Sequence, residues 1–162
     1  MEGRFEGMVD RVALFDRDGV LNVDHGYVCK VEDFEWVEGA SEVLDLCRSR
    51  GMGVGVITNQ SGIGRGYYSE GAFIDLMESV LPAGMVDLVV YCPHAPEADC
   101  TGRKPGGRML EMALRFFAVD GSLAFFVGDK ASDLGAADAA GVRGIRFQGG
   151  DLRDLSKDLG IS

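Results

Sequence analysis

The chain alternates between short apolar runs and longer segments in which apolar residues recur at helical spacing. The apolar runs are rich in β-branched residues and continuous enough to predict strands that are buried on both faces. We expect these strands over residues 11–16, 53–58, 87–92, 123–129 and 142–147. The amphipathic segments predict helices over residues 39–50, from the N-cap Ser69 to just before Pro82, and over residues 109–117, 132–140 and, with the weakest periodicity, 151–159.

Strands and helices alternate five times, which is the order of an α/β fold. Parallel neighbours need a crossover, usually a helix, so the alternation predicts a doubly wound parallel sheet. The chain has no repeat and no linker rich in Pro, Ser or Gly, and we expect one domain over residues 1–162. In such a sheet the ligand lies at the carboxyl ends of the strands, near the point where strand order reverses. Polar residues that follow strands are therefore the candidate site.

The composition is that of a globular protein, with 46% hydrophobic and 26% charged residues and no apolar run long enough to span a membrane. Sixteen basic and 26 acidic residues give a net charge of −10, which disfavours nucleic acid and anionic membranes as partners. Residues 1–7 lack the cationic start and the apolar stretch of a secretory signal. We therefore expect a cytoplasmic monomer whose four cysteines are reduced thiols or metal ligands.

Acidic residues follow two of the predicted strands. Asp16 and Asp18 stand one residue apart after the first strand, so they point to the same side in extended backbone, and Gly19 lets the chain turn away. Asp129 ends the fourth strand, and Asp133 lies one helical turn later, where it can brace the site. Oxygen ligands clustered in this way suit a hard cation such as Mg²⁺. A lone Asp-x-Asp is as typical of a solvated turn, but two acidic motifs at separate strand ends favour a magnesium site.

Groups that could hold an anion follow other strands. Thr58 and Asn59 supply short donors, and the glycine-rich loop after them exposes backbone N–H groups. In a chain of net charge −10, the few cations that follow strands point to a phosphate held beside the divalent cation. These cations are Arg65, Arg103, Lys104 and Lys130.

The motifs at these strand ends carry a resemblance to a known family. They are Asp16-Arg17-Asp18-Gly19, Thr58-Asn59-Gln60-Ser61-Gly62, Arg103-Lys104-Pro105, and Gly128-Asp129-Lys130 followed by Asp133. Their identity and order over residues 14–140 resemble the haloacid dehalogenase superfamily of phosphatases. Within it, the chain is similar to the branch that holds the heptose bisphosphate phosphatases and the histidinol-phosphate phosphatases. Residues 22–28 and 61–66 favour the heptose type.

The resemblance implies a phosphatase that works through an aspartyl-phosphate. Asp16 would be the nucleophile and Asp18 the acid and base. Thr58 and Lys104 would neutralise the phosphoryl oxygens, and Mg²⁺ would be held by Asp16, Asp129 and the main-chain carbonyl of Asp18. The rest of a small sugar phosphate substrate would contact Asp24, His25, Gly26, Tyr27, Asn59, Gln60, Ser61, Arg103 and Lys130.

The resemblance also implies a zinc site, from which this chain departs. The branch carries Cys-x-His and then two cysteines one residue apart, four ligands that close a structural site. Cys92, His94 and Cys100 are present, but Gly102 stands at the position of the last cysteine. Asp99, another loop residue or water would have to supply the fourth ligand. We expect either Zn²⁺ bound more weakly than at a full site or a loop that has lost its metal.

The resemblance implies a capless core, because the insert over residues 17–38 is too short for a separate domain. The expected substrate is D-glycero-D-manno-heptose 1,7-bisphosphate, hydrolysed to heptose 1-phosphate, with histidinol phosphate as the alternative. Two non-enzyme classes stay open. One is a phospho-receiver domain, disfavoured because Cys92-Pro93-His94 stands where that class carries its aspartate. The other is a sugar-phosphate-binding protein that has lost catalysis.

Overall fold

The structure is a computed structural model that describes residues 8–98 and 100–162. No helix among these residues is both long and apolar enough to cross a membrane. The strands are β1 (Val12–Phe15), β2 (Gly53–Asn59), β3 (Leu88–Cys92), β4 (Ala124–Gly128) and β5 (Arg143–Arg146). The α-helices are α1 (Ala40–Ser49), α2 (Ser61–Gly64), α3 (Glu70–Val80), α4 (Arg108–Phe117) and α5 (Ala131–Ala139). Short 3₁₀ turns are η1 (Val31–Asp33), η2 (Pro96–Ala98), η3 (Gly121–Leu123) and η4 (Leu152–Leu155).

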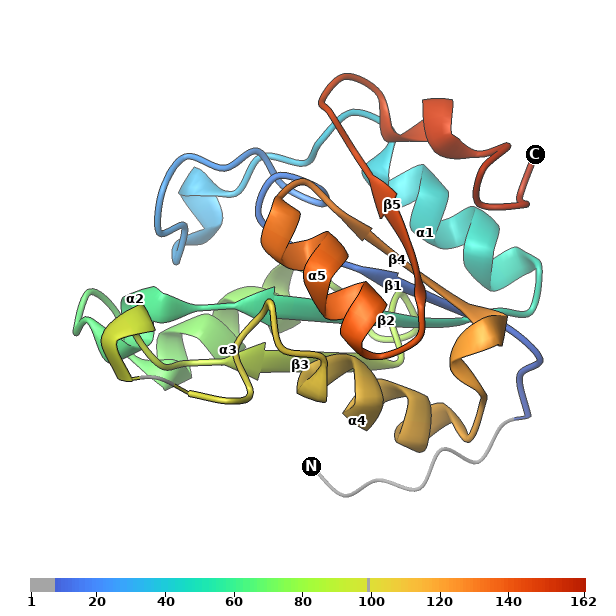
Figure 1. The fold of residues 1–162 in the computed structure, drawn as a ribbon. Coiled ribbons are helices and arrows are strands. Elements are labelled where there is room, and N and C mark those ends of the chain that lie inside the picture. Colours follow the sequence, from blue (N-terminus) through green and yellow to red (C-terminus); the bar gives the residue numbers. More distant parts are fainter. Residues whose placement is uncertain (1–7, 99) are drawn as a thin grey trace.

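The strands form one parallel sheet in the order β3-β2-β1-β4-β5 (Figure 1). Phe15 of β1 lies beside Val56 of β2 on one side and Val127 of β4 on the other. The chain runs outward from β1 through β2 to β3, and then returns to build the other half of the sheet. This order confirms the predicted doubly wound fold and places the reversal of strand order at β1.

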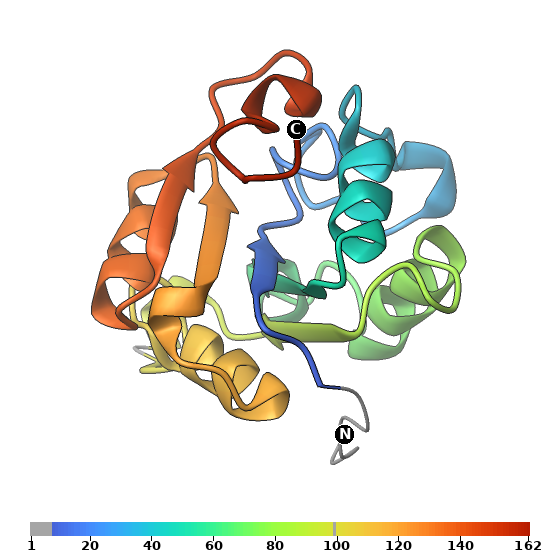
Figure 2. The same ribbon diagram turned by 90° about the vertical axis from the view of Figure 1, so that its right-hand side faces the viewer.

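Helices cover both faces of the sheet, with α1 and α3 on one face and α4 and α5 on the other (Figure 2). Leu44 of α1 and Phe73 of α3 are buried in the first core, while Leu110 of α4 and Ala136 of α5 are buried in the second. Successive residues of β1 alternate between these two cores, as the pleat of a strand requires. The sheet is therefore sealed on both faces, and its carboxyl edge is left for the site.

Burial differs between the central and the edge strands. All residues of β1 and β4 are buried, as predicted. The prediction of burial on both faces is wrong for β3, most of which is half-buried, and for β5, in which only Ile145 is buried. Each of these two strands has a neighbour on one side only, so its other edge is not covered by the sheet.

The predicted helices are confirmed except at the end of the chain. The Ser69 hydroxyl accepts a hydrogen bond from the backbone N–H of Ala72 at 3.0 Å, as expected of the N-cap of α3. The helix expected over residues 151–159 is wrong, because only η4 and a series of turns form there. The backbone N–H of Leu152 donates to Glu38 O, and Leu152 and Leu159 are fully buried. The apolar residues of this segment are therefore buried by contacts with the rest of the molecule and do not line one face of a helix.

Candidate active site

Three carboxylates converge at the carboxyl edge of the sheet. Asp16 follows β1, Asp129 follows β4, and Asp133 lies in the first turn of α5. One oxygen from each lies within 4.8 Å of the others. Asp133 Oδ2 accepts hydrogen bonds from the backbone N–H groups of Asp129 and Lys130, both at 3.1 Å. Asp133 thus braces the turn that presents Asp129, as the sequence predicts.

Lys104 brings a buried cation into this cluster. Its Nζ lies 3.0 Å from Asp16 Oδ1 and 2.5 Å from Asp133 Oδ1. Burial by itself lowers the pKa of Lys104, but the two carboxylates outweigh it and raise the pKa above its ordinary value. Burial likewise favours the neutral acid at Asp133, yet Lys104 and the two backbone donors hold the pKa of Asp133 below its ordinary value. Lys104 and Asp133 therefore form a charged pair inside the protein.

The remaining carboxylates keep an excess of negative charge. Burial, with the charges of Asp133 and Asp18 added, raises the pKa of Asp16 to about 7 even though Lys104 opposes the shift. Burial and Asp133 also raise the pKa of Asp129. Asp129 Oδ1 is buried and has no hydrogen-bond partner in the structure. A buried carboxylate oxygen without a donor, beside two further carboxylates, is the donor set of a hard divalent cation, and the residues present fit Mg²⁺.

Gly19 is required by the close approach of Asp129. It has a φ of +88°, and a Cβ at this position would lie 2.1 Å from Asp129 Oδ2. Any side chain here would strain the backbone and displace the carboxylate. The turn after β1 thus fits against the turn after β4 only because residue 19 is glycine.

Asp18 is held by donors on both of its oxygens. Arg17 Nη2 donates to Oδ1 at 2.7 Å, and Asn22 Nδ2 donates to the same oxygen at 3.0 Å. Gln60 Nε2 donates to Oδ2 at 3.2 Å. Arg17 is itself fully buried and also donates to Val28 O. These contacts fix the carboxylate of Asp18 at the edge of the pocket.

Gln60, predicted as a substrate contact, has every polar group of its side chain engaged within the chain. Its Nε2 donates to Thr58 Oγ1 at 2.8 Å as well as to Asp18, and its Oε1 accepts from the Tyr68 hydroxyl at 2.6 Å. The carboxylate of Asp18 can only accept, so it fixes the NH₂ end of the amide toward itself, and the Tyr68 hydroxyl, which can donate or accept, donates to the other end. Gln60 therefore connects Asp18 with Thr58, and Tyr68, which the motifs did not indicate, holds Gln60 in place.

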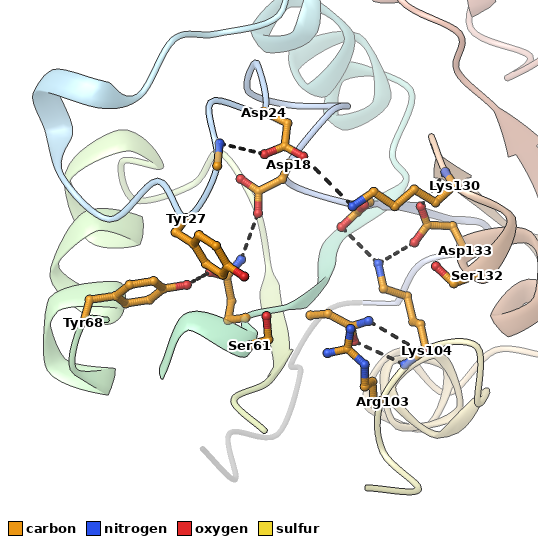
Figure 3. A pocket seen from close by; sticks show the side chains of 14 residues that line it. Asp18, Asp24, Tyr27, Ser61, Tyr68, Arg103, Lys104, Lys130, Ser132 and Asp133 are labelled. Carbon is orange, nitrogen blue, oxygen red and sulfur yellow. Dashed lines mark hydrogen bonds and ion pairs between the residues drawn. The ribbon is translucent and has the colours of Figure 1, made fainter. Parts of the chain in front are cut away.

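Most of these side chains line a pocket of about 310 Å³ (Figure 3). Lys130 and Asp24 face each other across it at 4.0 Å, and Lys104 reaches the carboxylates from the opposite side. Asn59 accepts a hydrogen bond from the backbone N–H of Lys104, which fixes the loop that carries the cation. The lining residues are Asp16, Asp18, Asp24, Gly26, Tyr27, Asn59, Gln60, Ser61, Tyr68, Arg103, Lys104, Lys130, Ser132 and Asp133. Most predicted residues meet here, and Tyr68 and Ser132 are additions.

Two predicted residues point elsewhere. His25 Nε2 lies 3.1 Å from Glu35 Oε2, in a separate acidic depression. Arg65 Nη2 pairs with Glu97 at 3.4 Å. Thr58 is buried behind the pocket wall, where it accepts the hydrogen bond from Gln60. The structure thus does not place His25, Arg65 or Thr58 among the residues that line this pocket, and Asp129 lines a separate depression beside Gly19.

The predicted zinc ligands form a second cluster. Cys92 Sγ lies 3.6 Å from His94 Nδ1 and 3.8 Å from Cys100 Sγ. Gly102 donates its backbone N–H to Cys100 Sγ at 3.4 Å. Asp99, considered as a fourth ligand, lies outside the described residues. Soft sulfur and imidazole ligands at these distances fit Zn²⁺, with three ligands supplied by the part of the chain that the structure describes.

The chain is similar to known phosphatases over most of its length. Residues 11–151 match the family described as polynucleotide kinase 3 phosphatase. The chain is 40% identical over 148 residues to the D-glycero-beta-D-manno-heptose-1,7-bisphosphate 7-phosphatase of Haemophilus ducreyi, covering 84% of this chain and 81% of that protein. The corresponding enzyme of Escherichia coli is 40% identical over 78% of this chain and 73% of its own length.

Solved structures with the same fold include two that are informative here. The D,D-heptose 1,7-bisphosphate phosphatase from B. bronchiseptica, complexed with magnesium and phosphate, is 29% identical with a TM-score of 0.81, over 91% of this chain and 86% of that one. A HAD-superfamily hydrolase from Geobacter sulfurreducens, 19% identical with a TM-score of 0.69 over 92% and 98% of the two chains, shares the fold.

Proposed function

The chain belongs to the haloacid dehalogenase superfamily of phosphatases, and we propose that it removes the 7-phosphate of D-glycero-D-manno-heptose 1,7-bisphosphate. One observation carries the choice of a bisphosphate. The pocket has a buried cation, Lys104, beside Asp16, and two further cations, Arg103 and Lys130, among its lining residues. A sugar with a phosphate at each end would meet cations at both of its ends.

In the proposed first step, Asp16 attacks phosphorus. A new bond forms between a carboxylate oxygen and phosphorus, and the bond from phosphorus to the sugar oxygen breaks. Asp18 gives its proton to the departing oxygen, which leaves as the sugar hydroxyl. Lys104 and the Thr58 hydroxyl stabilise the charge on the phosphoryl oxygens. In the structure the Thr58 hydroxyl donates to the backbone oxygen of Asn59 at 3.4 Å and accepts from Gln60, so its proposed role requires the hydroxyl proton to turn from Asn59 to the substrate.

In the second step, Asp18 takes a proton from water, whose oxygen attacks the phosphorus of the aspartyl-phosphate. The bond to Asp16 breaks, inorganic phosphate leaves, and both aspartates return to their starting states. The three donors around Asp18 keep its carboxylate in one place for both proton transfers. A group that acts first as acid and then as base must stay within reach of both the leaving oxygen and the attacking water, which a fixed carboxylate does.

Asp16 and Asp129 would hold Mg²⁺ with the main-chain carbonyl of Asp18. The buried and unpartnered Asp129 Oδ1 supports this assignment. When bound, the cation supplies charge that offsets the repulsion between the nucleophile and the phosphoryl group. Asp133 is already occupied by Lys104 and by two backbone donors, so we assign it to positioning.

The sugar and its second phosphate would contact Asp24, Gly26, Tyr27, Ser61, Arg103 and Lys130, all of which line the pocket. His25 is not part of this proposal, because it pairs with Glu35 outside the pocket. We assign all of these residues to one domain without a cap. In the described part of the chain, the insert between β1 and α1 contains only loops and η1, and it forms one wall of the pocket.

The proposal is tested by phosphate release from a substrate panel, with and without Mg²⁺. The panel contains both anomers of heptose 1,7-bisphosphate, histidinol phosphate and an oligonucleotide with a 3′-phosphate. We expect Mg²⁺-dependent turnover that is highest with the heptose, and loss of the 7-phosphate signal in ³¹P NMR spectra. Asp16→Asn should abolish turnover, whereas Asp45→Asn, on the exposed side of α1, should not change it. Preference for histidinol phosphate would overturn the assignment of heptose bisphosphate as the substrate. Turnover by Asp16→Asn would overturn the assignment of Asp16 as the nucleophile.

We also propose that Cys92, His94 and Cys100 hold Zn²⁺ and stabilise the loop between β3 and Lys104. The spacing of the ligand atoms supports this proposal, since Cys92 Sγ lies 3.6 Å from His94 Nδ1 and 3.8 Å from Cys100 Sγ. Metal analysis after mild purification is the test. About one equivalent of zinc is expected, and less than about a tenth would refute the site.

A further inference from the structure

Beyond the phosphatase site, the Cys92, His94 and Cys100 cluster departs from a closed structural metal site. We propose that it holds Zn²⁺ with a fourth coordination position open to a soft, monodentate anion from solution, such as a small thiolate. The inference rests on the proposed zinc site and is independent of the phosphatase activity. It concerns the ligand of zinc at the fourth position, for which the described residues supply no side chain.

Two of the three distances between the ligand atoms match those that tetrahedral zinc requires. With Zn–S of about 2.3 Å and Zn–N of about 2.0–2.1 Å, a regular tetrahedron has S to S edges of about 3.8 Å and S to N edges of about 3.6 Å. The distance between the sulfurs of Cys92 and Cys100 is 3.8 Å, and that from Cys92 Sγ to His94 Nδ1 is 3.6 Å. These two edges match a zinc tetrahedron, and the ligand atoms of His94 and Cys100 lie within 4.8 Å of each other.

The fourth corner has no ligand among the described residues, where the cluster has three members. Gly102 lies beside Cys100, one of the three ligands. A Cβ built on Gly102 would be 3.5 Å from Cys100 Sγ, an ordinary contact, and the backbone of Gly102 is not in the left-handed region. A cysteine side chain could therefore be accommodated at position 102, next to the other ligands. Glycine leaves that volume empty.

The space beside the cluster can take a ligand. A cavity of about 250 Å³ is lined by the three ligands together with Thr101, Arg108 and Met112. Two thiolates and a neutral imidazole cancel the charge of Zn²⁺, so an added thiolate makes the complex an anion. Arg108, which lines the same cavity, would stabilise that anion, and the thioether of Met112 suits a soft ligand. Zinc with three protein ligands and a free position is the arrangement that accepts exchangeable ligands.

The test uses Co²⁺ as a spectroscopic probe in the full chain after removal of its metal. Wild type should give the visible absorption of tetrahedral, thiolate-bound Co²⁺. Added 2-mercaptoethanol or azide should shift these bands in a saturable manner. Gly102→Cys should show a four-ligand spectrum that neither additive changes. It should also bind zinc at least about tenfold more tightly in chelator competition, because even the loss of a partner outside the first shell weakens metal sites by about 10–100-fold.

Each alternative result is informative. Bands in wild type that do not shift with either additive would mean that the chain fills the fourth position, and the inference would fail; recovery of the shift in Asp99→Ala would identify that ligand. Co²⁺ binding by Gly102→Cys alone would also overturn it, because three ligands would then be too few. Cys29→Ser, outside the cluster, and Asp16→Asn, without the nucleophile, should leave the spectrum unchanged. The spectrum thus separates this inference from the phosphatase assignment.

Discussion

Replacing Lys104 with methionine tests whether this one cation holds together Asp16, the proposed nucleophile, and Asp133; we call these three residues the nucleophile cluster. Its Nζ lies between Asp16 and Asp133, at 3.0 and 2.5 Å, and all three side chains are buried. Lys104→Met keeps an unbranched apolar stem but leaves the two carboxylates without a cation. Removing one partner of a buried ion pair destabilises a protein by about 3–5 kcal/mol. We expect a loss in that range, a large part of the roughly 5–15 kcal/mol by which a domain is stable.

A second substitution separates the charge effect from lost packing. Asp133→Asn removes one of the two stranded charges while keeping the shape of the side chain. Lys104→Met/Asp133→Asn should therefore be about 2–3 kcal/mol more stable than the sum of the single changes predicts, at the upper end of couplings between contacting residues. A coupling of 2 kcal/mol is about 30-fold in the unfolding equilibrium.

Urea unfolding followed by circular dichroism measures this coupling. A chelator must be present, because Mg²⁺ bound to the native state would add stability of its own. Lys130→Met is the matched control: this lysine is 63% exposed and lies 4.0 Å from Asp24, so its loss should change stability by less than about 0.5 kcal/mol. Additivity within about 0.5 kcal/mol, or a Lys104→Met loss no larger than that of the control, would refute the reasoning.

Three further predictions concern the proposed catalytic groups. Burial raises the pKa of Asp16 to about 7, and Mg²⁺ requires the ionised form of this side chain. The apparent Kd for Mg²⁺, measured by calorimetry, should therefore rise about tenfold for each pH unit below 7. A Kd that does not change with pH would contradict this. Gly19→Ala should displace Asp129 and lower kcat by at least about 10²-fold, and a crystal structure should show the carboxylate moved. Tyr68→Phe leaves Gln60 Oε1 without its donor and should lower kcat by about 3–10-fold with KM retained. Its companion substitution, Gln60→Glu, replaces the amide donor at Asp18 and should also change the pH profile of kcat. An unchanged profile would argue that Gln60 has a merely structural role.

The convergence of the aspartates could be predicted from the sequence because strand ends carry positional information. In a parallel sheet the carboxyl ends meet at one edge, so residues that follow separate strands become neighbours. Asp16, Asp129 and Lys104 obey this rule, although Lys104 reaches the edge from a loop well beyond β3. Their type and order were enough to predict the cluster.

The contacts of Gln60 and His25 could not be predicted from their positions after strands. The position of Gln60 beside Thr58 was visible, but its function follows from side-chain bonds to Asp18 and Tyr68 across two loops. The only signal for Tyr68 was an aromatic residue after the glycine-rich loop. His25 turns toward Glu35, ten residues later, through an exposed pairing that no periodicity encodes. The hydrogen-bond partner of such a side chain depends on which groups the fold brings close to it, and the sequence pattern does not show this.

The nucleophile cluster also has a consequence for folding kinetics. Asp16 comes from the first strand, Lys104 from the middle of the chain and Asp133 from the helix after β4, so none of the local segments that fold earliest contains a working site. Contacts between such distant parts of a chain form late, because long loops must close first. Recovery of enzymatic turnover during refolding should therefore report the final docking of the two halves of the sheet on β1, after the helical signal has returned. The rate at which activity returns would therefore measure the rate of the last step of folding.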